Sequence, residues 1–243
     1  MRFGVCTPNF GSWADPRLLM RAADAARRAG WEAFFVWDHL SFVWGRPSAD
    51  PWVLLTVAAT AADGLLLGTA VTPVPRRRPQ VLAQTVATLS ELSGGRVVLG
   101  AGLGGNRKEF EAFGESYDRR RRLALFDEGL EQMREIWSPK RIPVWVGGTS
   151  PAMLERAARY DGWIADRAGK DAMQMSPDEI RERSRGIGGD VVVNGYSEPG
   201  ERELVCAYED AGGTWWLETL PDWRAPVEEL IRRIEAGPPT RSS

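Results

Sequence analysis

The sequence predicts an α/β protein that folds as a single (β/α)8 TIM barrel, with a shortened segment before the fifth strand. Eight short apolar runs alternate with eight longer segments of helical period, so that each unit takes about 30 of the 243 residues. Strict alternation of this kind requires parallel strands joined by crossover helices, and eight such units close into a barrel. A doubly wound open sheet is the alternative fold.

The expected strands are segments in which β-branched and aromatic residues run together before a turn signal. In chain order they cover residues 2–7, 33–37, 65–71, 97–101, 143–146, 162–165, 190–193 and 213–218. The runs are short enough for strands and too short for stable helices, which is why they are assigned to the sheet.

The expected helices follow the strands, and three of them begin at an N-cap residue followed by proline, at Asp15-Pro16, Asp50-Pro51 and Ser176-Pro177. The others are recognised by apolar residues that recur at spacings of three and four. In chain order the helices cover residues 16–29, 51–62, 79–92, 121–137, 151–160, a segment that opens at 177, 199–211 and 222–236. We therefore expect one barrel domain over residues 1–236 and a frayed tail over residues 237–243.

The composition excludes several classes of function. The chain has 31 basic and 33 acidic residues, so it lacks the basic excess of a nucleic-acid-binding protein. It has no apolar run long enough to span a membrane, and its first ten residues do not read as a signal peptide. One histidine and two cysteines, Cys6 and Cys206, rule out the usual His/Cys zinc sites. Two scattered cysteines also favour a reduced, cytoplasmic protein.

The barrel fold directs attention to the residues that follow each strand, because sites on this fold lie at the C-terminal ends of the strands. The residues in question are Pro8-Asn9-Phe10, Asp38-His39, Thr72-Pro73, Leu103-Gly104-Gly105-Asn106, Gly147-Gly148-Thr149, Asp166-Arg167, Asn194-Gly195 and Glu218.

His39 is the only side chain of the set whose unperturbed pKa lies near neutrality. At the barrel mouth it would donate to a cofactor ring or exchange a proton with a substrate, or it would only bond a loop carbonyl. Arg76, Arg77 and Arg78 follow the third strand. They form either a rim that faces an anion or a solvated run at a helix start.

Two glycine-rich turns are candidates for ligand binding. The glycines of residues 100–105 allow a planar ligand to approach the backbone, although their spacing is not that of a dinucleotide fingerprint. Gly147-Gly148-Thr149-Ser150 precedes a helix and is either a phosphate cradle or an ordinary capped loop. Most of the tryptophans are expected in the packing, and a few at the mouth would form an aromatic wall.

The chain resembles a known family, the luciferase-like flavin-dependent oxidoreductases, which include enzymes that use the deazaflavin coenzyme F420. The resemblance covers most of the chain and is most specific in its middle third. It rests on AGWEAFFVWDHL (29–40), LLLGTAVTPVPRRRPQVLAQTVATLSELSGGRVVLGAGLG (65–104), EFEAFGE (109–115), FDEGLEQMREIW (126–137) and IPVWVGG (142–148).

The resemblance implies a cofactor at the C-terminal mouth, with His39 as the catalytic residue beside the reactive ring. It places Asp38 at a neighbouring cofactor contact and a non-proline cis peptide at Ala70-Val71, behind the ring. The other cofactor contacts that it implies are Thr72, Leu103, Gly104, Gly147, Gly148 and Thr149. The last three of these match the phosphate-binding turn of the family.

The chain departs from the family pattern in three places. Leu103 stands where the luciferases place an arginine for the flavin phosphate, and Gly105 where the sugar-oxidising deazaflavin enzymes carry a catalytic glutamate. The segment 137–143 is much shorter than the one that relatives carry before the fifth strand. The first departure argues against FMN binding by that route, and the third predicts a more open site.

The resulting hypothesis is an oxidoreductase that uses F420 or FMN for hydride transfer or monooxygenation of a small organic substrate. The alternatives are a flavin-binding protein without turnover and a flavin-independent barrel enzyme that acts on phosphorylated substrates. The resemblance also implies a homodimer, and a flavin reductase is a candidate partner. We expect no nucleic-acid partner, no membrane contact and no metal.

Overall fold

The computed structural model describes residues 1–165 and 175–239. Its strands all belong to one sheet, in the order β3-β2-β1-β9-β8-β7-β6-β5-β4. They are β1 (Arg2–Thr7), β2 (Ala33–Val36), β3 (Leu66–Thr69), β4 (Thr72–Pro73), β5 (Val97–Gly102), β6 (Val144–Gly147), β7 (Gly162–Ala165), β8 (Asp190–Gly195) and β9 (Trp215–Thr219).

The sheet is parallel throughout and closes into a barrel. The pairing of β1 with β9 joins the first and last strands, while β3 and β4 both pair with β5. β3 and β4 therefore together form one of the eight strands of the barrel. They are separated by the cis peptide Ala70-Val71. This arrangement confirms the predicted (β/α)8 barrel and excludes the open sheet. It also corrects the third strand, which was expected to run unbroken over 65–71.

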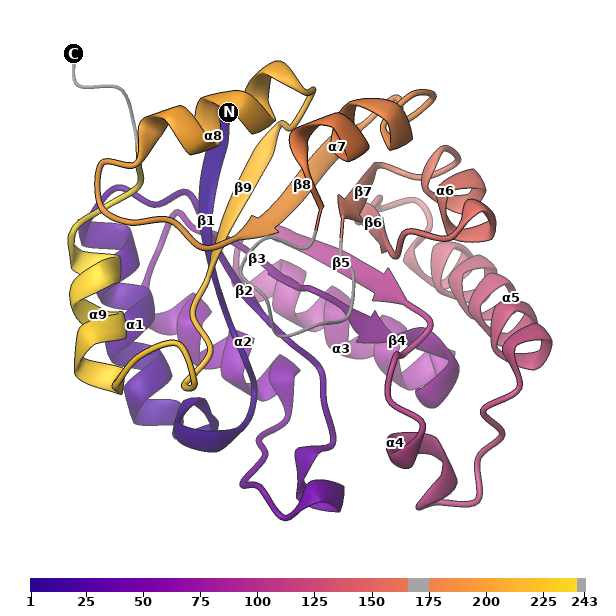
Figure 1. Cartoon of the computed structure of the whole chain (residues 1–243). Helices are drawn as coiled ribbons and strands as arrows, with labels where there is room; N and C mark the ends of the chain where they lie inside the picture. The colour runs from indigo at the N-terminus through magenta and orange to yellow at the C-terminus, as the bar shows by residue number, and fades with distance from the viewer. Residues whose placement is uncertain (166–174, 240–243) are drawn as a thin grey trace.

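Helices surround the barrel (Figure 1). They are α1 (Pro16–Arg28), α2 (Pro51–Ala61), α3 (Pro79–Leu92), α4 (Lys108–Glu111), α5 (Arg119–Trp137), α6 (Pro151–Ala157), α7 (Pro177–Arg183), α8 (Arg202–Asp210) and α9 (Val227–Glu235), with 3-10 turns at Gly11–Ala14, Ser41–Trp44 and Val74–Arg76. The helices expected over 199–211 and 222–236 are shorter in the structure, where they are α8 and α9. Helix α4 was not predicted.

The N-caps expected from the sequence are confirmed. Asp15 and Asp50 accept hydrogen bonds from the first amides of α1 and α2, at 2.8 Å and 2.9 Å. Ser176 forms a full capping box with Glu179. These residues begin each helix at a defined point after the preceding strand or loop, and thereby fix the length of the connection.

The apolar core has two parts, because successive side chains of a strand point to opposite faces. On β1, Cys6 belongs to the cluster inside the barrel, whereas Val5 packs in the larger cluster between the barrel and the helices. Inside, Phe35 stacks on Trp145 with ring centroids 5.5 Å apart. The barrel is therefore filled below its C-terminal mouth, which leaves the mouth as the place for a site.

Some residues named in the sequence analysis fall at or beyond the limits of the described residues, 1–165 and 175–239. Asp166 and Arg167, expected beside the mouth, lie outside the described residues, as does the tail beyond Pro239. Gly237, expected in that tail, accepts a hydrogen bond from Arg233 at 2.8 Å. The division into a domain at 1–236 and a tail stays a prediction. In the described residues no helix combines the length and apolar character needed to cross a membrane.

Candidate functional site

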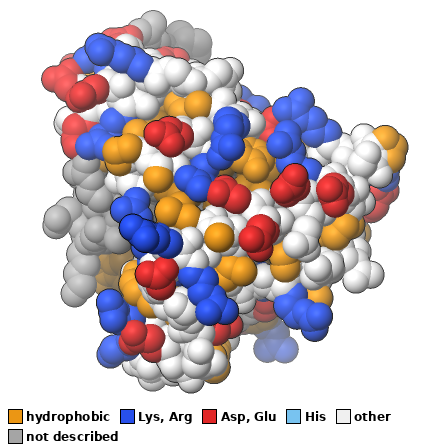
Figure 2. Space-filling model, turned by 90° about the vertical axis from the view of Figure 1, so that its right-hand side faces the viewer, with side chains coloured by type: hydrophobic (Ala, Val, Ile, Leu, Met, Phe, Trp, Pro, Cys, Tyr) orange, Lys and Arg blue, Asp and Glu red, His pale blue; other side chains and the backbone are white. Residues whose placement is uncertain are grey.

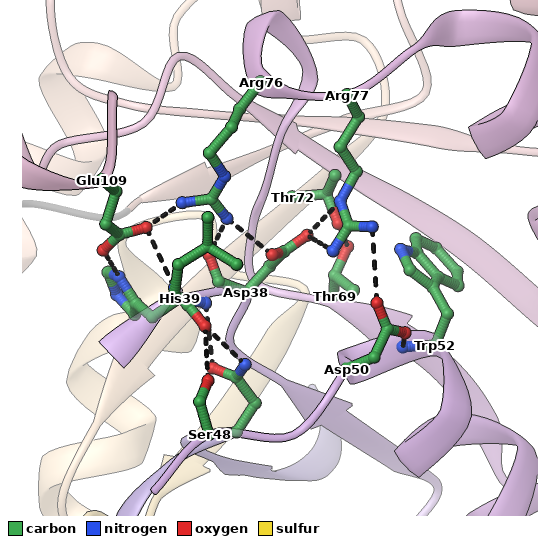
Figure 3. A network of polar contacts seen from close by, with 12 residues as sticks. Asp38, His39, Ser48, Asp50, Trp52, Thr69, Thr72, Arg76, Arg77 and Glu109 are labelled. Atoms are coloured by element: carbon green, nitrogen blue, oxygen red, sulfur yellow. Dashed lines mark hydrogen bonds and ion pairs between the residues drawn. The ribbon is translucent and has the colours of Figure 1, made fainter. Parts of the chain in front are cut away.

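A network of charged side chains lies at the C-terminal ends of the first strands (Figure 3). Asp38 and His39 follow β2, Arg76 and Arg77 follow β4, and Glu109 lies on α4. The fold thus brings together two residues that the sequence predicted for the site and three that it did not assign to it. The five side chains come from three separate connections of the barrel.

The backbone of His39 is held by three hydrogen bonds. Asn9 accepts from the His39 amide at 2.9 Å and donates through its own amide nitrogen to the His39 carbonyl at 2.8 Å. The hydroxyl of Ser48 donates to the same carbonyl at 3.0 Å. Because Asn9 is fully buried, this clamp fixes where the imidazole starts. The imidazole itself is 32% exposed, so it lies at the surface of the mouth.

Glu109 orients the imidazole. Its Oε1 lies 2.6 Å from Nδ1 of His39, and its Oε2 accepts from the Leu40 amide at 3.2 Å and also contacts Arg76. An ionised carboxylate only accepts hydrogen bonds, so Nδ1 carries a proton in this arrangement. Nε2 is then the ring nitrogen through which His39 would exchange a proton with a ligand, and this role stays a prediction. The Glu109 side chain is only 2% exposed, which protects this contact from water.

The arginines that follow β4 are bound to buried carboxylates. Nη2 of Arg76 donates to Oδ1 of Asp38 at 2.7 Å, and Nε of Arg77 donates to Oδ2 at 2.9 Å. The Arg76 side chain is 4% exposed and that of Asp38 is fully buried. Arg76 is therefore neither part of a solvated run nor an open anion-binding rim, which corrects both sequence-based interpretations. The contact of Asp38 with a cofactor stays a prediction. Asp38 would make that contact while it keeps its hydrogen bonds to Arg76 and Arg77.

Burial and charge act in opposite directions on the two guanidinium groups. Burial lowers the pKa of Arg76, and Asp38 offsets only part of this effect. For Arg77 burial also favours the neutral form, but the charges and hydrogen bonds of Asp38 and Asp50 together outweigh burial and raise the pKa. The two arginines thus face three carboxylates, because Arg77 also lies 3.5 Å from Oδ2 of Asp50 in addition to the contacts with Asp38 and Glu109. The ion pairs offset part of the cost of burying these charges and join the loops that carry them.

The predicted cis peptide at Ala70-Val71 is confirmed. The Val71 side chain lies against two glycines of the neighbouring strands. A Cβ atom added to Gly102 would lie 2.3 Å from one Val71 methyl group, and one added to Gly147 would lie 2.6 Å from the other. The glycines therefore admit Val71 into the barrel wall. Thr72, beside it, bonds Thr69 through their hydroxyl groups at 3.1 Å.

The loop that contains Leu103 and Gly104 is held by Arg122 of α5. The guanidinium donates to the carbonyls of Gly104 at 2.6 Å, Leu103 at 3.3 Å and Tyr117 at 3.2 Å, and it stacks 3.8 Å over the ring of Tyr117. Gly104 has a φ of +81°, which favours glycine. Arg122 thus shapes this loop.

The turn Gly147-Gly148-Thr149 follows β6, as predicted. Gly148 has a φ of +116°, its amide donates to the Ile164 carbonyl at 3.3 Å, and its carbonyl accepts from the Trp163 indole at 2.8 Å. Ser150, at the N-cap position of α6, makes no side-chain cap. These observations do not test the phosphate-binding role, which stays a prediction.

Aromatic rings gather around His39. The ring of Phe10 lies within 6.2 Å, between centroids, of the rings of Trp37, His39, Trp44 and Trp223. Trp223 is 45% exposed, so it forms the outer part of the group. Most of the other tryptophans are buried in the packing, as the sequence analysis expected.

Glu218 and Asn194 lie at the ends of β9 and β8. Both oxygens of the buried Glu218 are bonded, to the amide and hydroxyl of Ser197 and to Arg224 and Arg233. Glu218 therefore ties the β8–α8 connection to α9. In contrast, Oδ1 of Asn194 is buried and finds no partner among the described residues.

Sequence reasoning missed Glu109 as a site residue. The available signal was the pair of acidic residues in EFE, four residues after the last glycine of the glycine-rich loop, since a carboxylate close to the mouth can face His39. Arg76 was noticed, but its partners lie 38 and 33 residues away and leave no local pattern.

Comparison with known proteins gives relatives in both sequence and structure. An F420-dependent hydroxymycolic acid dehydrogenase of Mycobacterium tuberculosis is 33% identical over 181 residues, which cover 60% of this chain and 48% of the relative. An F420-dependent glucose-6-phosphate dehydrogenase of Beutenbergia cavernae is 37% identical over 135 residues, 53% of this chain and 39% of the relative. The chain thus spans less than half the length of these two relatives.

Solved structures share the fold. An F420-dependent secondary alcohol dehydrogenase, in complex with an F420-acetone adduct, superposes with a TM-score of 0.77 at 17% identity over 98% of both chains. The oxygenating constituent of the 3,6-diketocamphane monooxygenase of Pseudomonas putida, in complex with FMN, has a TM-score of 0.71 at 15% identity, over 97% of this chain and 96% of its own. The family model of the luciferase-like monooxygenases matches residues 1–195, and the chain therefore belongs to the luciferase-like monooxygenase family.

Proposed function

We propose that this chain is an oxidoreductase that binds F420 or FMN at the C-terminal mouth of its barrel. It would transfer a hydride to or from a small organic substrate, or support monooxygenation of one. The observation that carries the proposal is the partly exposed imidazole of His39, held by the buried Glu109 at the mouth of a barrel of this family. The relatives named above use F420, which supports the same choice.

The polar groups at the mouth fit a cofactor of this kind. Oδ1 of Asn194 and Nε1 of Trp44 are buried polar atoms with no partner among the described residues. Asn194 lies two residues after Val192 on β8, and Val192 faces the barrel interior. Residues two apart on a strand point to the same face, so the Asn194 side chain also faces the interior. A heterocycle with amide groups and a polyhydroxylated chain supplies both donors and acceptors for such atoms.

When bound, the cofactor supplies the redox chemistry. Under this proposal the chain contributes position and a proton. Val71, seated against Gly102 and Gly147, would contact the cofactor ring, and the turn Gly147-Gly148-Thr149 would hold its phosphate. His39 donates or accepts a proton at Nε2, while Glu109 fixes its orientation.

The role of His39 is tested by His39→Ala. We expect turnover to fall by about 10²–10⁴-fold, the range for loss of a general acid or base. Cofactor affinity, measured by fluorescence titration, should change far less, because the backbone clamp by Asn9 and Ser48 does not depend on the ring. Equal losses in turnover and affinity would leave His39 only a binding role.

The choice of cofactor is tested by titrating the protein with FMN and with F420 and following ring fluorescence. Tight binding of F420 alone would assign hydride transfer, and tight binding of FMN would favour monooxygenation. Binding without turnover of any redox substrate would support a flavin-binding protein. Binding of neither cofactor would refute the proposal and favour a barrel that acts on phosphorylated substrates.

We also propose a homodimer and a cytoplasmic location, with a flavin reductase as a further partner if the cofactor is FMN. The family supports the first proposal, and the small number of cysteines in the sequence, two, supports the second. Sedimentation of the purified protein would test the dimer.

A further inference from the structure

Three connections of the barrel meet near His39 through one ion pair. Nη2 of Arg46, in the connection after β2, donates to Oδ2 of Asp222, in the connection after β9, at 2.6 Å. The same oxygen accepts a hydrogen bond from the amide of Ser12, in the connection after β1, at 3.2 Å. The ion pair therefore ties three loops of the mouth to one another.

The backbone before Ser12 is shaped around this ion pair. Gly11 has a φ of +64°, which favours glycine, and its amide donates to the Pro47 carbonyl at 2.9 Å. A Cβ atom added to Gly11 would overlap the side chains of both Asp222 and Arg46. The glycine thus admits the ion pair, and a larger residue at this position would force the two side chains apart.

The ion pair lies against the group of aromatic rings at the mouth. The guanidinium carbon of Arg46 is 4.9 Å from the centroid of the Phe10 ring. Trp223, the residue after Asp222, stacks on the same ring, with 19° between the planes and 6.2 Å between the centroids. Its ring centroid is also 5.7 Å from that of Trp37. The position of Asp222 therefore determines where the neighbouring Trp223 ring lies.

These rings adjoin the imidazole of His39. The centroid of the imidazole is 5.7 Å from that of Phe10 and 6.0 Å from that of Trp37. Phe10 is 3% exposed, whereas Trp223 is 45% exposed and keeps nearly half of its surface for another contact. A molecule that exchanges a proton with His39 lies within reach of this group. Aromatic rings gain energy from stacking beyond the area that they bury.

The group differs from the apolar residues elsewhere on the surface. On the face that carries α5 and α6, hydrophobic side chains lie in small groups among basic and acidic ones (Figure 2). Exposed apolar residues of that kind are ordinary on a protein surface. Aromatic rings gathered around a partly exposed imidazole instead indicate a place where a ligand binds.

We propose that the substrate carries a flat aromatic ring beside its reacting carbon, and that Trp223 selects this ring by stacking on it. Arg46 and Asp222 act as positioning residues, because they hold Trp223 in place without contact to the substrate. The inference rests on the proposed function and names the class of substrate for it.

The test compares two ketones, acetophenone and cyclohexyl methyl ketone. Both carry a methyl ketone on a six-membered ring, and only acetophenone has a flat aromatic ring. The protein is first titrated with oxidised F420 and oxidised FMN, and is then loaded with the cofactor that binds. An oxidised cofactor has no hydride to give, so the ketones bind without reacting, and isothermal titration calorimetry measures their dissociation constants.

We expect the unchanged protein to bind acetophenone about threefold to tenfold more tightly than cyclohexyl methyl ketone, as for one aromatic stacking contact. Trp223→Leu keeps an apolar side chain but removes the ring, and should abolish this preference. Trp223→Phe keeps a ring and should retain most of it. Arg46→Met and Asp222→Asn should each reduce the preference to less than about half, while the affinity for cyclohexyl methyl ketone stays unchanged.

The matched control is Arg21→Met. Arg21 of α1 and Glu228 of α9 form an exposed ion pair at 2.6 Å, which resembles the pair at the mouth but lies between two helices. Its removal should leave the preference for acetophenone at its full value. Thermal melting of each variant shows that the chain is folded.

Equal affinity of the unchanged protein for the two ketones, or no binding of either, would overturn the inference and leave the proposed function standing. A preference that survives Trp223→Leu would have the same meaning. So would a loss of cofactor affinity in Trp223→Leu without a change in ketone preference, since the ring would then serve the cofactor. A preference that persists in both Arg46→Met and Asp222→Asn would overturn the role of the ion pair. Failure of both cofactors to bind would instead refute the proposed function, and this inference with it.

Discussion

Glu109→Gln is the perturbation that most directly probes the candidate site. Glu109 binds the Leu40 amide, Nδ1 of His39 and a guanidinium nitrogen of Arg76. Glutamine has the same shape but only one acceptor oxygen, and its NH2 group faces a donor at the other position. The substitution removes one hydrogen-bond acceptor and the negative charge beside a buried guanidinium. Arg76 is left to share Asp38 with Arg77.

The expected cost follows from burial. Removing one partner of a buried ion pair destabilises proteins by about 3–5 kcal/mol, because the other charge stays buried. Arg76 keeps one carboxylate, so we expect the lower end, about 3 kcal/mol. For a chain of this length, 1 kcal/mol corresponds to about 2–4 °C, and the melting temperature should fall by about 6–12 °C.

Urea unfolding and thermal melting of Glu109→Gln measure this cost, and Glu111→Gln is the matched control on the same short helix. Glu111 is 52% exposed, and its one ion pair among the described residues is with Arg107, at 3.2 Å. An exposed pair of this kind contributes at most about 0.5 kcal/mol. If Glu109→Gln costs no more than Glu111→Gln, the buried pairs do not hold this part of the site together.

Three further predictions concern the walls of the mouth. Gly147→Ala should destabilise the protein by about 1–3 kcal/mol in urea unfolding, because the added methyl group overpacks against Val71. Adding Val71→Ala to the same chain should recover most of this loss, and additive losses would contradict the contact. Arg122→Lys should speed proteolytic cleavage within residues 103–117, because one ammonium group cannot replace a planar guanidinium that donates to three carbonyls. An unchanged cleavage rate would contradict this role of Arg122. Glu218→Gln should lower stability to urea by about 3–5 kcal/mol, since it strips the charge that faces two arginines, and a loss below about 1 kcal/mol would contradict the buried network.

The barrel could be predicted from the sequence because its signals are repeated and local. Each strand is a short apolar run, and caps such as Asp15 and Ser176 mark where helices begin. The third strand was predicted too long, since no charged residue or proline interrupts residues 65–71 and the cis peptide that ends β3 leaves no such signal. Helix α4 was missed because four residues are too few to show a helical period.

The candidate site was only half predictable, for a different physical reason. His39 and Asp38 follow a strand, and that position alone marks them in a barrel. What the side chains do depends on partners that come from other connections: Asn9 lies 30 residues from His39, and Glu109 lies 70. A run of three arginines reads as exposed until the buried acids that it meets are known.

These long-range pairs also explain how the described loops after β2, β4 and β5 are held together. Asp38 follows β2, Arg76 follows β4, and Glu109 follows β5, so a single chain of ion pairs joins three connections of the barrel. Apolar packing fixes the strands, and the ion pairs join the loops above them in addition to the aromatic contacts of Phe10. Buried charges have strict geometric requirements, and satisfying them leaves few arrangements for the loops that carry them. The imidazole of His39 belongs to this network through Glu109, so its place at the mouth depends on the same contacts that order the loops.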